Sequence, residues 1–260
     1  MKKLMIAGVA GLFAAVSFGE LASANTVGYN TVKIKGGKMN LLTVSWESVG
    51  NADNKANLKD VMSTDGLTSY SADMIPGDYI DTWDMENGNW GFTYYYIDLP
   101  EFGLADQWID GSLAPAEILM NPGSSFWLYH KGEDIPALAF QGQVTTVTSG
   151  YTLTGGKLNL CGNPYPTALD LNASAGQVTI TGATSYTANM EPGDYIDTWD
   201  LKNSNWGFTY YYINLPEFGL ADQWIDGSLS PATTDIQPGA GFWYYAKNPG
   251  TTLTFTKLSN

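Results

Sequence analysis

The sequence has little of what catalysis and metal binding usually need: among 260 residues there are one histidine, one cysteine and no arginine. A zinc cage, a Cys/His catalytic pair and a disulfide framework each require more of these residue types than the chain contains. Its cations are 12 lysines against 26 aspartates and glutamates, which gives a formal net charge of −14. Because nucleic acids and anionic membrane surfaces are bound through lysine and arginine, we predict neither as a partner.

Long apolar runs are also absent after the first residues of the chain. Residues 4–18 are apolar, follow Lys2 and Lys3, and precede Ala22-Ser23-Ala24. This is the pattern of a secretory signal peptide, so we predict cleavage after residue 24 and no membrane insertion afterwards. The predicted location is the cell surface, the periplasm or the medium. Cys161 is expected to be a buried small hydrophobic residue.

A near-identical repeat is the strongest feature of the sequence. Residues 68–113 match residues 184–229 at an offset of 116, with differences at only seven of 46 positions. Weaker matches on both sides extend the repeat, so we predict two tandem domains, a first copy at 25–141 and a second at 142–260. The short connection near Gln141 predicts that the copies hold a fixed relative orientation.

Within each copy the pattern is that of β-strands. Residues 27–34 alternate before a Gly-Gly turn and predict a hairpin with 39–46, while 79–83 and 90–97 flank an Asn-Gly turn and predict a second hairpin. Only 57–62 and 102–108 resemble short helices. We therefore predict an all-β protein, with two tandem homologous antiparallel β-sandwich or partly closed β-barrel domains.

Six aspartates recur at equivalent positions of the repeat and offer oxygen ligands for Ca²⁺. They are Asp78, Asp81 and Asp84 in the first copy and Asp194, Asp197 and Asp200 in the second. Alternation along a strand would turn Asp81 away from Asp78 and Asp84, and turn formation is the competing explanation for the acids. Calcium is therefore a possible cofactor, and no other cofactor is predicted.

Aromatic residues recur in the same segment and predict a platform on which sugar rings stack. The predicted platform residues are Trp90, Tyr94, Tyr95 and Tyr96, with Trp206, Tyr210, Tyr211 and Tyr212 in the second copy. Alternation places Trp90, Phe92, Tyr94 and Tyr96 on one face of the strand and Tyr95 on the other. One face must be core, and a row of rings on the opposite face could bind a glycan.

An enzyme is the least favoured class. Glycoside hydrolysis uses two carboxylates, and Asp81 with Glu101 is a conceivable pair, although nothing in their spacing identifies it. His130 corresponds to Ala246 in the second copy, so it belongs to no shared catalytic site. We predict no catalytic residue.

Three short motifs frame the repeat: Asn25-Thr26-Val27-Gly28-Tyr29, a Gly-x-x-Asn-Leu step at 37–41, and Asn121-Pro122-Gly123-x-x-Phe126-Trp127. Together they resemble a group of uncharacterised secreted proteins of Gram-negative bacteria. The resemblance implies a β-rich extracellular domain and no catalytic residues. Combined with the repeat and the predicted export, it favours a non-enzymatic adhesive or structural protein that assembles with itself into a surface layer or fibre. The alternative is a carbohydrate-binding protein whose partner is an extracellular glycan.

Overall fold

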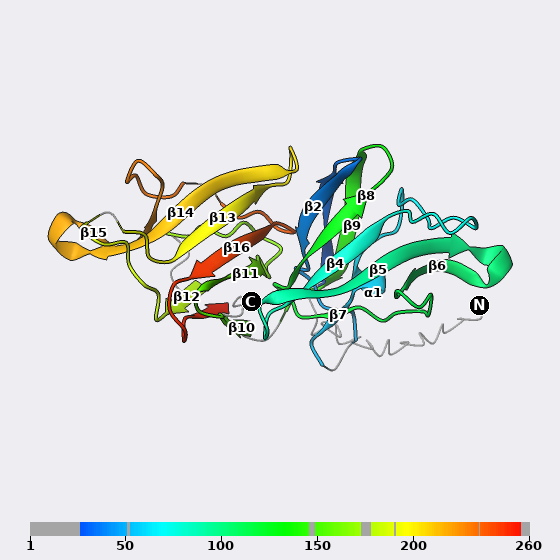
Figure 1. Ribbon diagram of the computed structural model, residues 1–260, viewed down its shortest axis with the longest axis horizontal. Helices are drawn as coiled ribbons and strands as arrows, with labels where there is room; N and C mark the ends of the chain where they lie inside the picture. Colours follow the sequence, from blue (N-terminus) through cyan, green and yellow to red (C-terminus); the bar gives the residue numbers. More distant parts are fainter. Residues whose placement is uncertain are drawn as a thin grey trace, which may run out of the picture.

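The computed structural model describes residues 27–50, 53–145, 149–172, 178–189, 191–233 and 235–255. The predicted signal peptide lies outside these residues. Strands dominate both copies, as Figure 1 shows, and the prediction of an all-β sandwich-type fold is confirmed. Within the described part of the chain, no sheet closes into a barrel.

The first copy is built around a five-stranded antiparallel sheet in the order β2-β8-β4-β5-β6. Its elements are β1 Val27–Ile34, β2 Lys38–Thr43, β3 Ala56–Asn57, α1 Leu58–Val61, β4 Tyr79–Asp84, β5 Asn89–Leu99, η1 Pro100–Phe102, β6 Leu104–Ile109, β7 Leu119–Met120, β8 Ser125–His130 and β9 Ile135–Gln143. A second layer, formed by β1 paired with β9, packs against this sheet. Ile80, Phe126 and Leu128 of the large sheet meet Ile34 and Phe140 of the small one in a common core.

The second copy repeats this plan, with a five-stranded sheet in the order β11-β16-β13-β14-β15 covered by a sheet in the order β10-β17-β12. Its elements are β10 Ser149–Thr152, β11 Lys157–Gly162, β12 Val178–Thr181, β13 Tyr195–Asp200, β14 Asn205–Leu215, η2 Pro216–Phe218, β15 Leu220–Ile225, β16 Gly241–Ala246 and β17 Thr252–Phe255. The core contains Ile196, Phe242 and Tyr244 on one side and Leu253 and Phe255 on the other.

Two local predictions are wrong because tertiary pairing overrides the local pattern. Residues 27–34 and 39–46 do not form a hairpin: β1 pairs with β9 and β2 pairs with β8, so the chain changes layers at the Gly-Gly turn. Gly36 is needed at this corner, since a Cβ there would lie 2.2 Å from the carbonyl oxygen of Gly132. Residues 102–108 form mostly strand β6, which pairs with β5, whereas the short helix predicted within 57–62 is present as α1.

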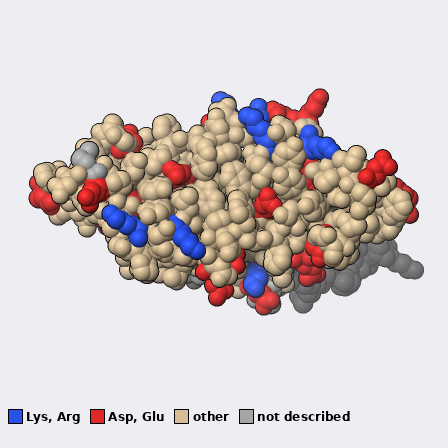
Figure 2. All heavy atoms as spheres, viewed as in Figure 1, with Lys and Arg blue, Asp and Glu red and all other residues tan. Residues whose placement is uncertain are grey.

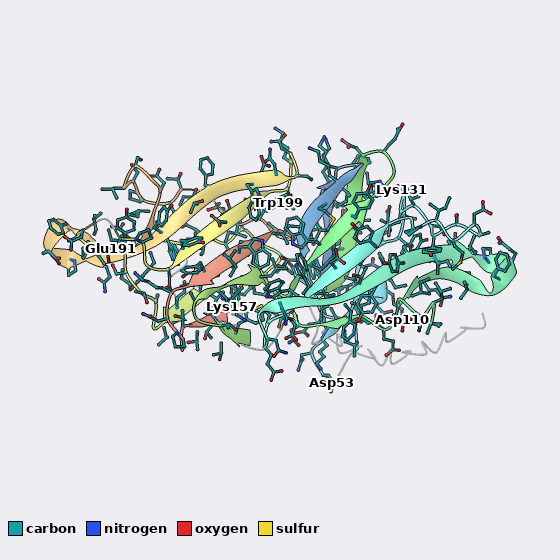
Figure 3. All side chains as sticks on the ribbon, in the orientation of Figure 1. Asp53, Asp110, Lys131, Lys157, Glu191 and Trp199 are labelled. Atoms are coloured by element: carbon teal, nitrogen blue, oxygen red, sulfur yellow. The ribbon has the colours of Figure 1, made fainter. Side chains whose placement is uncertain are left out.

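The two copies meet face to face through tryptophans. Trp83 packs edge-on against Trp243 with 4.8 Å between ring centroids, and Trp127 packs edge-on against Trp199 at 4.9 Å. At the repeat offset of 116, position 83 corresponds to 199 and position 127 to 243, so a two-fold rotation exchanges the two contacts. This is the self-complementary arrangement of symmetric dimers, and the chain therefore folds as a covalently linked pseudo-dimer. Figure 3 labels Trp199 at this contact.

Backbone and side-chain contacts follow the same two-fold relation and extend the interface. The isolated bridges Leu42–Ala240 and Ser124–Cys161 join positions that are equivalent after exchange of the copies. Ser204 Oγ donates a hydrogen bond of 2.6 Å to Asn40 Oδ1 across the interface. These contacts fix the orientation of one copy relative to the other.

The hairpins β5–β6 and β14–β15 extend away from the interface and form the two ends of an elongated molecule (Figure 1). β9 continues to Gln143, which pairs with Val27, so the first copy's sheet extends two residues past the predicted boundary. Among the described residues, no helix has the length and apolar character needed to cross a membrane.

Candidate functional site

A β-bulge redistributes the aromatic residues of β5. Asp81 pairs with Thr93 and Trp83 pairs with Trp90, so β5 has two residues where β4 has one. The extra residue reverses the alternation of faces, and Trp90 therefore shares a face with Thr93 and Trp83. The prediction that Trp90 lies with Tyr94 and Tyr96 is wrong for this reason. The second copy has the same irregularity between Asp197 and Trp199, which brings Trp206 onto the equivalent face.

The predicted platform is thereby divided between two faces. Tyr96 is buried in the first core against Trp108, and Tyr94 packs against that core at its margin. In the second copy Tyr210 is buried and Tyr212 packs beside Trp224. Burial, followed by a hydrogen bond to Asp106, raises the pKa of Tyr96 to about 12. These four tyrosines are mainly structural.

Tyr95 and Tyr211 instead belong to rows of four half-buried tyrosines on the sheet face that also carries the interface tryptophans. In the first copy the ring centroids of Tyr129 and Tyr79 are 5.0 Å apart, those of Tyr79 and Tyr95 6.1 Å, and those of Tyr95 and Tyr70 5.9 Å. The corresponding row in the second copy is Tyr245, Tyr195, Tyr211 and Tyr186. An open row of rings on the non-core face is therefore present in both copies.

The predicted calcium ligands do not converge. Asp78 is fully buried and makes its hydrogen bonds inside the protein. Asp81 accepts a 2.6 Å hydrogen bond from Thr93 Oγ1. Asp84 caps the hairpin turn, where it accepts hydrogen bonds from the backbone N–H groups of Glu86 and Asn87. Their counterparts Asp194, Asp197 and Asp200 occupy the same three environments. In the described ranges, no three acidic, histidine or cysteine side chains form a group that could hold a metal ion.

The single histidine has a structural partner. His130 is buried, its Nδ1 lies 2.6 Å from Asp78 Oδ2, and its Nε2 lies 2.6 Å from the carbonyl oxygen of Glu133. In the second copy the buried Asp194 accepts its hydrogen bond from Tyr244 OH at 2.9 Å. Each copy therefore satisfies an equivalent buried carboxylate with a different side chain, and neither aromatic partner is open to a substrate.

The conceivable hydrolase pair is also separated by the fold. Asp81 pairs with Thr93 within β5, whereas Glu101 follows the far end of that strand. The six steps from Thr93 to Leu99 span about 20 Å, at about 3.3 Å per residue. Glycosidase carboxylates lie about 5 to 9.5 Å apart, so Asp81 and Glu101 do not form such a pair.

Each copy has a pocket beside its β4–β5 or β13–β14 hairpin, and the two pockets are equivalent. The first-copy pocket has a volume of about 360 Å³ and the second-copy pocket about 410 Å³. At the offset of 116, nine lining positions coincide: Thr82/Thr198, Trp83/Trp199, Met85/Leu201, Phe92/Phe208, Leu119/Asp235, Met120/Ile236, Asn121/Gln237, Ser124/Ala240 and Ser125/Gly241. Both volumes are within the usual range for small-ligand sites.

The bulge holds a phenyl ring in the solvent at each pocket. Phe92 is 72% exposed and Phe208 is 60% exposed. Thr82 Oγ1 accepts a hydrogen bond from the Phe92 N–H at 2.8 Å and donates one to the Phe92 carbonyl at 3.0 Å. Gly91 leaves room for this clamp, since a Cβ there would lie 2.6 Å from Thr82 Oγ1. The second copy builds the same clamp from Thr198, Gly207 and Phe208.

A second pair of exposed phenylalanines lies at the two ends of the molecule. Phe102 and Phe218 are each 64% exposed in the turns η1 and η2, next to Glu101 and Glu217. Figure 2 shows acidic side chains at both ends, with lysines and further acidic side chains scattered over the face between them.

No protein-family model, no curated protein and no solved structure matches this chain. The site must therefore be judged on its own geometry. Sequence reasoning did not select Phe92, Phe208, Phe102 or Phe218 as site residues. Their identity in both copies was visible, but their exposure depends on the bulges and turns, which only the fold shows.

Proposed function

We propose that this protein is a non-enzymatic adhesive or structural protein of the cell exterior, which acts through two equivalent copies of one surface. The observation that carries the proposal is a set of exposed aromatic residues repeated in both copies. The pairs are Trp90/Trp206, Phe92/Phe208 and Phe102/Phe218. Trp90 and Phe92 lie near the start of β5 and Phe102 lies beyond its far end, so each copy exposes aromatic rings at two places. Exposed apolar patches are typical of contact surfaces.

Identity at exposed positions supports this function. In the first copy, all seven positions that differ between residues 68–113 and 184–229 are exposed or half-buried, yet the exposed rings Trp90, Phe92 and Phe102 are unchanged. A contact made by each copy accounts for identical exposed rings.

Fixed orientation makes two such surfaces more effective than one. The tryptophan interface holds both copies in one rigid body, so the second contact with a repetitive partner becomes intramolecular. Self-assembly would proceed through the hairpin ends, since each molecule offers two of them and end-to-end contacts build an open fibre. Glu101 and Glu217 would repel across such a contact, and salt or a bridging calcium ion would reduce this repulsion.

Carbohydrate binding is the second candidate function, favoured by the rows of tyrosines on the open sheet face. Asp81 lies beside this row in the first copy. The pKa of Tyr79 is raised, first by partial burial of its ring and then by the negative charge of Asp81. Tyr195 and Asp197 repeat the arrangement. Rings cover the apolar face of a sugar, while a neighbouring carboxylate accepts hydrogen bonds from its hydroxyl groups.

The test is sedimentation velocity of residues 25–260 at increasing protein and salt concentration, together with retention on insoluble polysaccharides. We expect either oligomers that grow with salt, and that are absent in the double variant F102S/F218S, or retention on a polysaccharide. A monomer under all conditions that no matrix retains would refute an adhesive function. Release of shorter sugars from a retained polysaccharide would refute the non-enzymatic assignment.

A further inference from the structure

We infer that the two pockets beside the hairpins β4–β5 and β13–β14 are equivalent binding sites for the pyranose rings of a neutral polysaccharide. The inference rests on the proposed function, in its carbohydrate-binding form, and assigns the ligand class and the contact residues. It places the sites at Phe92 and Phe208, and of the predicted platform residues Tyr94 lines the first pocket.

The fold builds the same unusual feature twice. In each copy a bulge, a glycine that cannot carry a Cβ and a threonine clamp combine to hold one phenylalanine outward. Bulges commonly redirect a side chain next to a functional site. Phe92 contacts Tyr94 and Phe208 contacts Tyr210, with 6.2 and 6.1 Å between ring centroids, but most of each phenylalanine is in solvent. A ligand that covers the ring gives it a role.

The walls of the two pockets share the same side-chain chemistry. Beside the two rings Trp83 and Phe92, the first pocket is lined by the amide Asn121, the carboxylate Glu117 and the ammonium group of Lys55. The second pocket has Trp199 and Phe208 with the amide Gln237, the carboxylate Asp235 and the ammonium group of Lys202. Each pocket thus combines the same four chemical types, although the lysine and the acid come from non-equivalent positions.

This combination suits a ligand with one apolar face and many hydroxyl groups. A pyranose presents C–H groups to an aromatic ring and hydroxyl groups to amides, carboxylates and ammonium groups around its edge. A lipid chain would instead favour an enclosed apolar cavity, and these rings remain open to water. The pocket volumes of about 360 and 410 Å³ leave room for a sugar unit.

The negative net charge of the protein favours a neutral polysaccharide over an anionic one. The chain has 26 acidic residues against 12 lysines, so a polyanion such as alginate is repelled over the whole surface. A neutral glucan avoids this cost. Two sites on one rigid body further favour a long polymer over a single sugar, because one polymer can occupy both.

The experiment is affinity electrophoresis of residues 25–260 in native gels that contain hydroxyethyl cellulose, soluble starch or alginate. We compare the wild type with F92S, F208S and F92S/F208S. The matched control is Y29S, which removes a ring of similar exposure, 75% against 72% for Phe92, that lies outside the pockets and outside the proposed contact residues. Thermal melting checks that every variant folds.

We expect retardation of the wild type and of the control in one of the neutral gels and none in alginate. Each single variant should bind about tenfold more weakly, and the double variant about a hundredfold more weakly, as loss of two linked contacts requires. Equal retardation of wild type and F92S/F208S would overturn the pocket assignment while leaving carbohydrate binding intact. Retardation in alginate alone would overturn the neutral class, and no retardation in any gel would overturn the carbohydrate ligand while leaving self-assembly to be judged by sedimentation.

Discussion

Replacing Trp127 by alanine removes one of the rings that join the two copies. Trp127 is 8% exposed and packs against Trp199 of the second copy. A buried tryptophan removes about 200 Å² from water, which at about 25 cal/mol per Å² gives an upper value of about 5 kcal/mol. Measured substitutions of this kind cost about 3 to 5 kcal/mol. We therefore expect a loss of about 4 kcal/mol and a Tm lower by about 8 to 16 °C.

The two-fold relation supplies the matched comparison. W243A removes the equivalent ring, whose contact is with Trp83, and should cost about the same. The double variant should lose less than the sum, since both substitutions weaken one interface. W90A is the control, because Trp90 is 56% exposed and its loss should cost under about 1 kcal/mol.

The assay is urea and thermal unfolding followed by far-UV circular dichroism, which does not depend on tryptophan fluorescence. A fall in Tm of less than about 3 °C for W127A would refute the interface as described. A large effect of W127A with no effect of W243A would refute the two-fold arrangement, because the account assigns the two rings the same role.

Three further outcomes follow from the structure. H130A leaves the buried Asp78 carboxylate without its ring partner and should lower the free energy of unfolding, followed by thermal melting, by about 3 kcal/mol. Adding L128Y should restore part of this stability, because it supplies the hydroxyl group used in the second copy. No rescue would contradict the equivalence of the two networks. Burial raises the pKa of the Cys161 thiol, so a disulfide reagent should label it slowly in the folded protein and rapidly in urea, and fast labelling of the native chain would place the thiol at the surface. A hydrogen bond from Lys35 lowers the pKa of Asp134 from 3.8 to about 2. The ion pair therefore contributes fully to folding stability above pH 3.8, and this contribution is lost as the pH falls to about 2. The stability of D134N should change less with pH over this interval, and an unchanged pH dependence would contradict the ion pair.

The sequence predicted the fold class well because its information is periodic and local. The repeat offset, the strand alternation and the Asn-Gly turn between β4 and β5 all correspond to observed features, and Gly88 in that turn has a φ of 61°. The pairing partner of each strand was harder to predict from the sequence. The residues of β1 and β2 look like a hairpin, but each strand pairs with residues 82 to 116 positions later in the chain. Alternation alone does not encode this choice of partner.

The site was less predictable than the fold. A single extra residue at the Gly91–Phe92 bulge moved Trp90 to the other face, so the predicted platform combined residues from two environments. Three aspartates with regular spacing offered oxygen ligands for calcium, yet each has a separate structural task. Burial and neighbours decide such roles, and both depend on tertiary structure.

The most direct test of the account is the rate at which the protein leaves a surface coated with a neutral polysaccharide or with the protein itself. The comparison uses two half-variants, F92S/F102S in the first copy and F208S/F218S in the second. Because the two copies present equivalent contact surfaces, dissociation should be faster by the same factor for both half-variants, about tenfold or more relative to the wild type. Dissociation like the wild type for one half-variant and complete loss for the other would contradict it, as would a wild-type protein that attaches to neither surface.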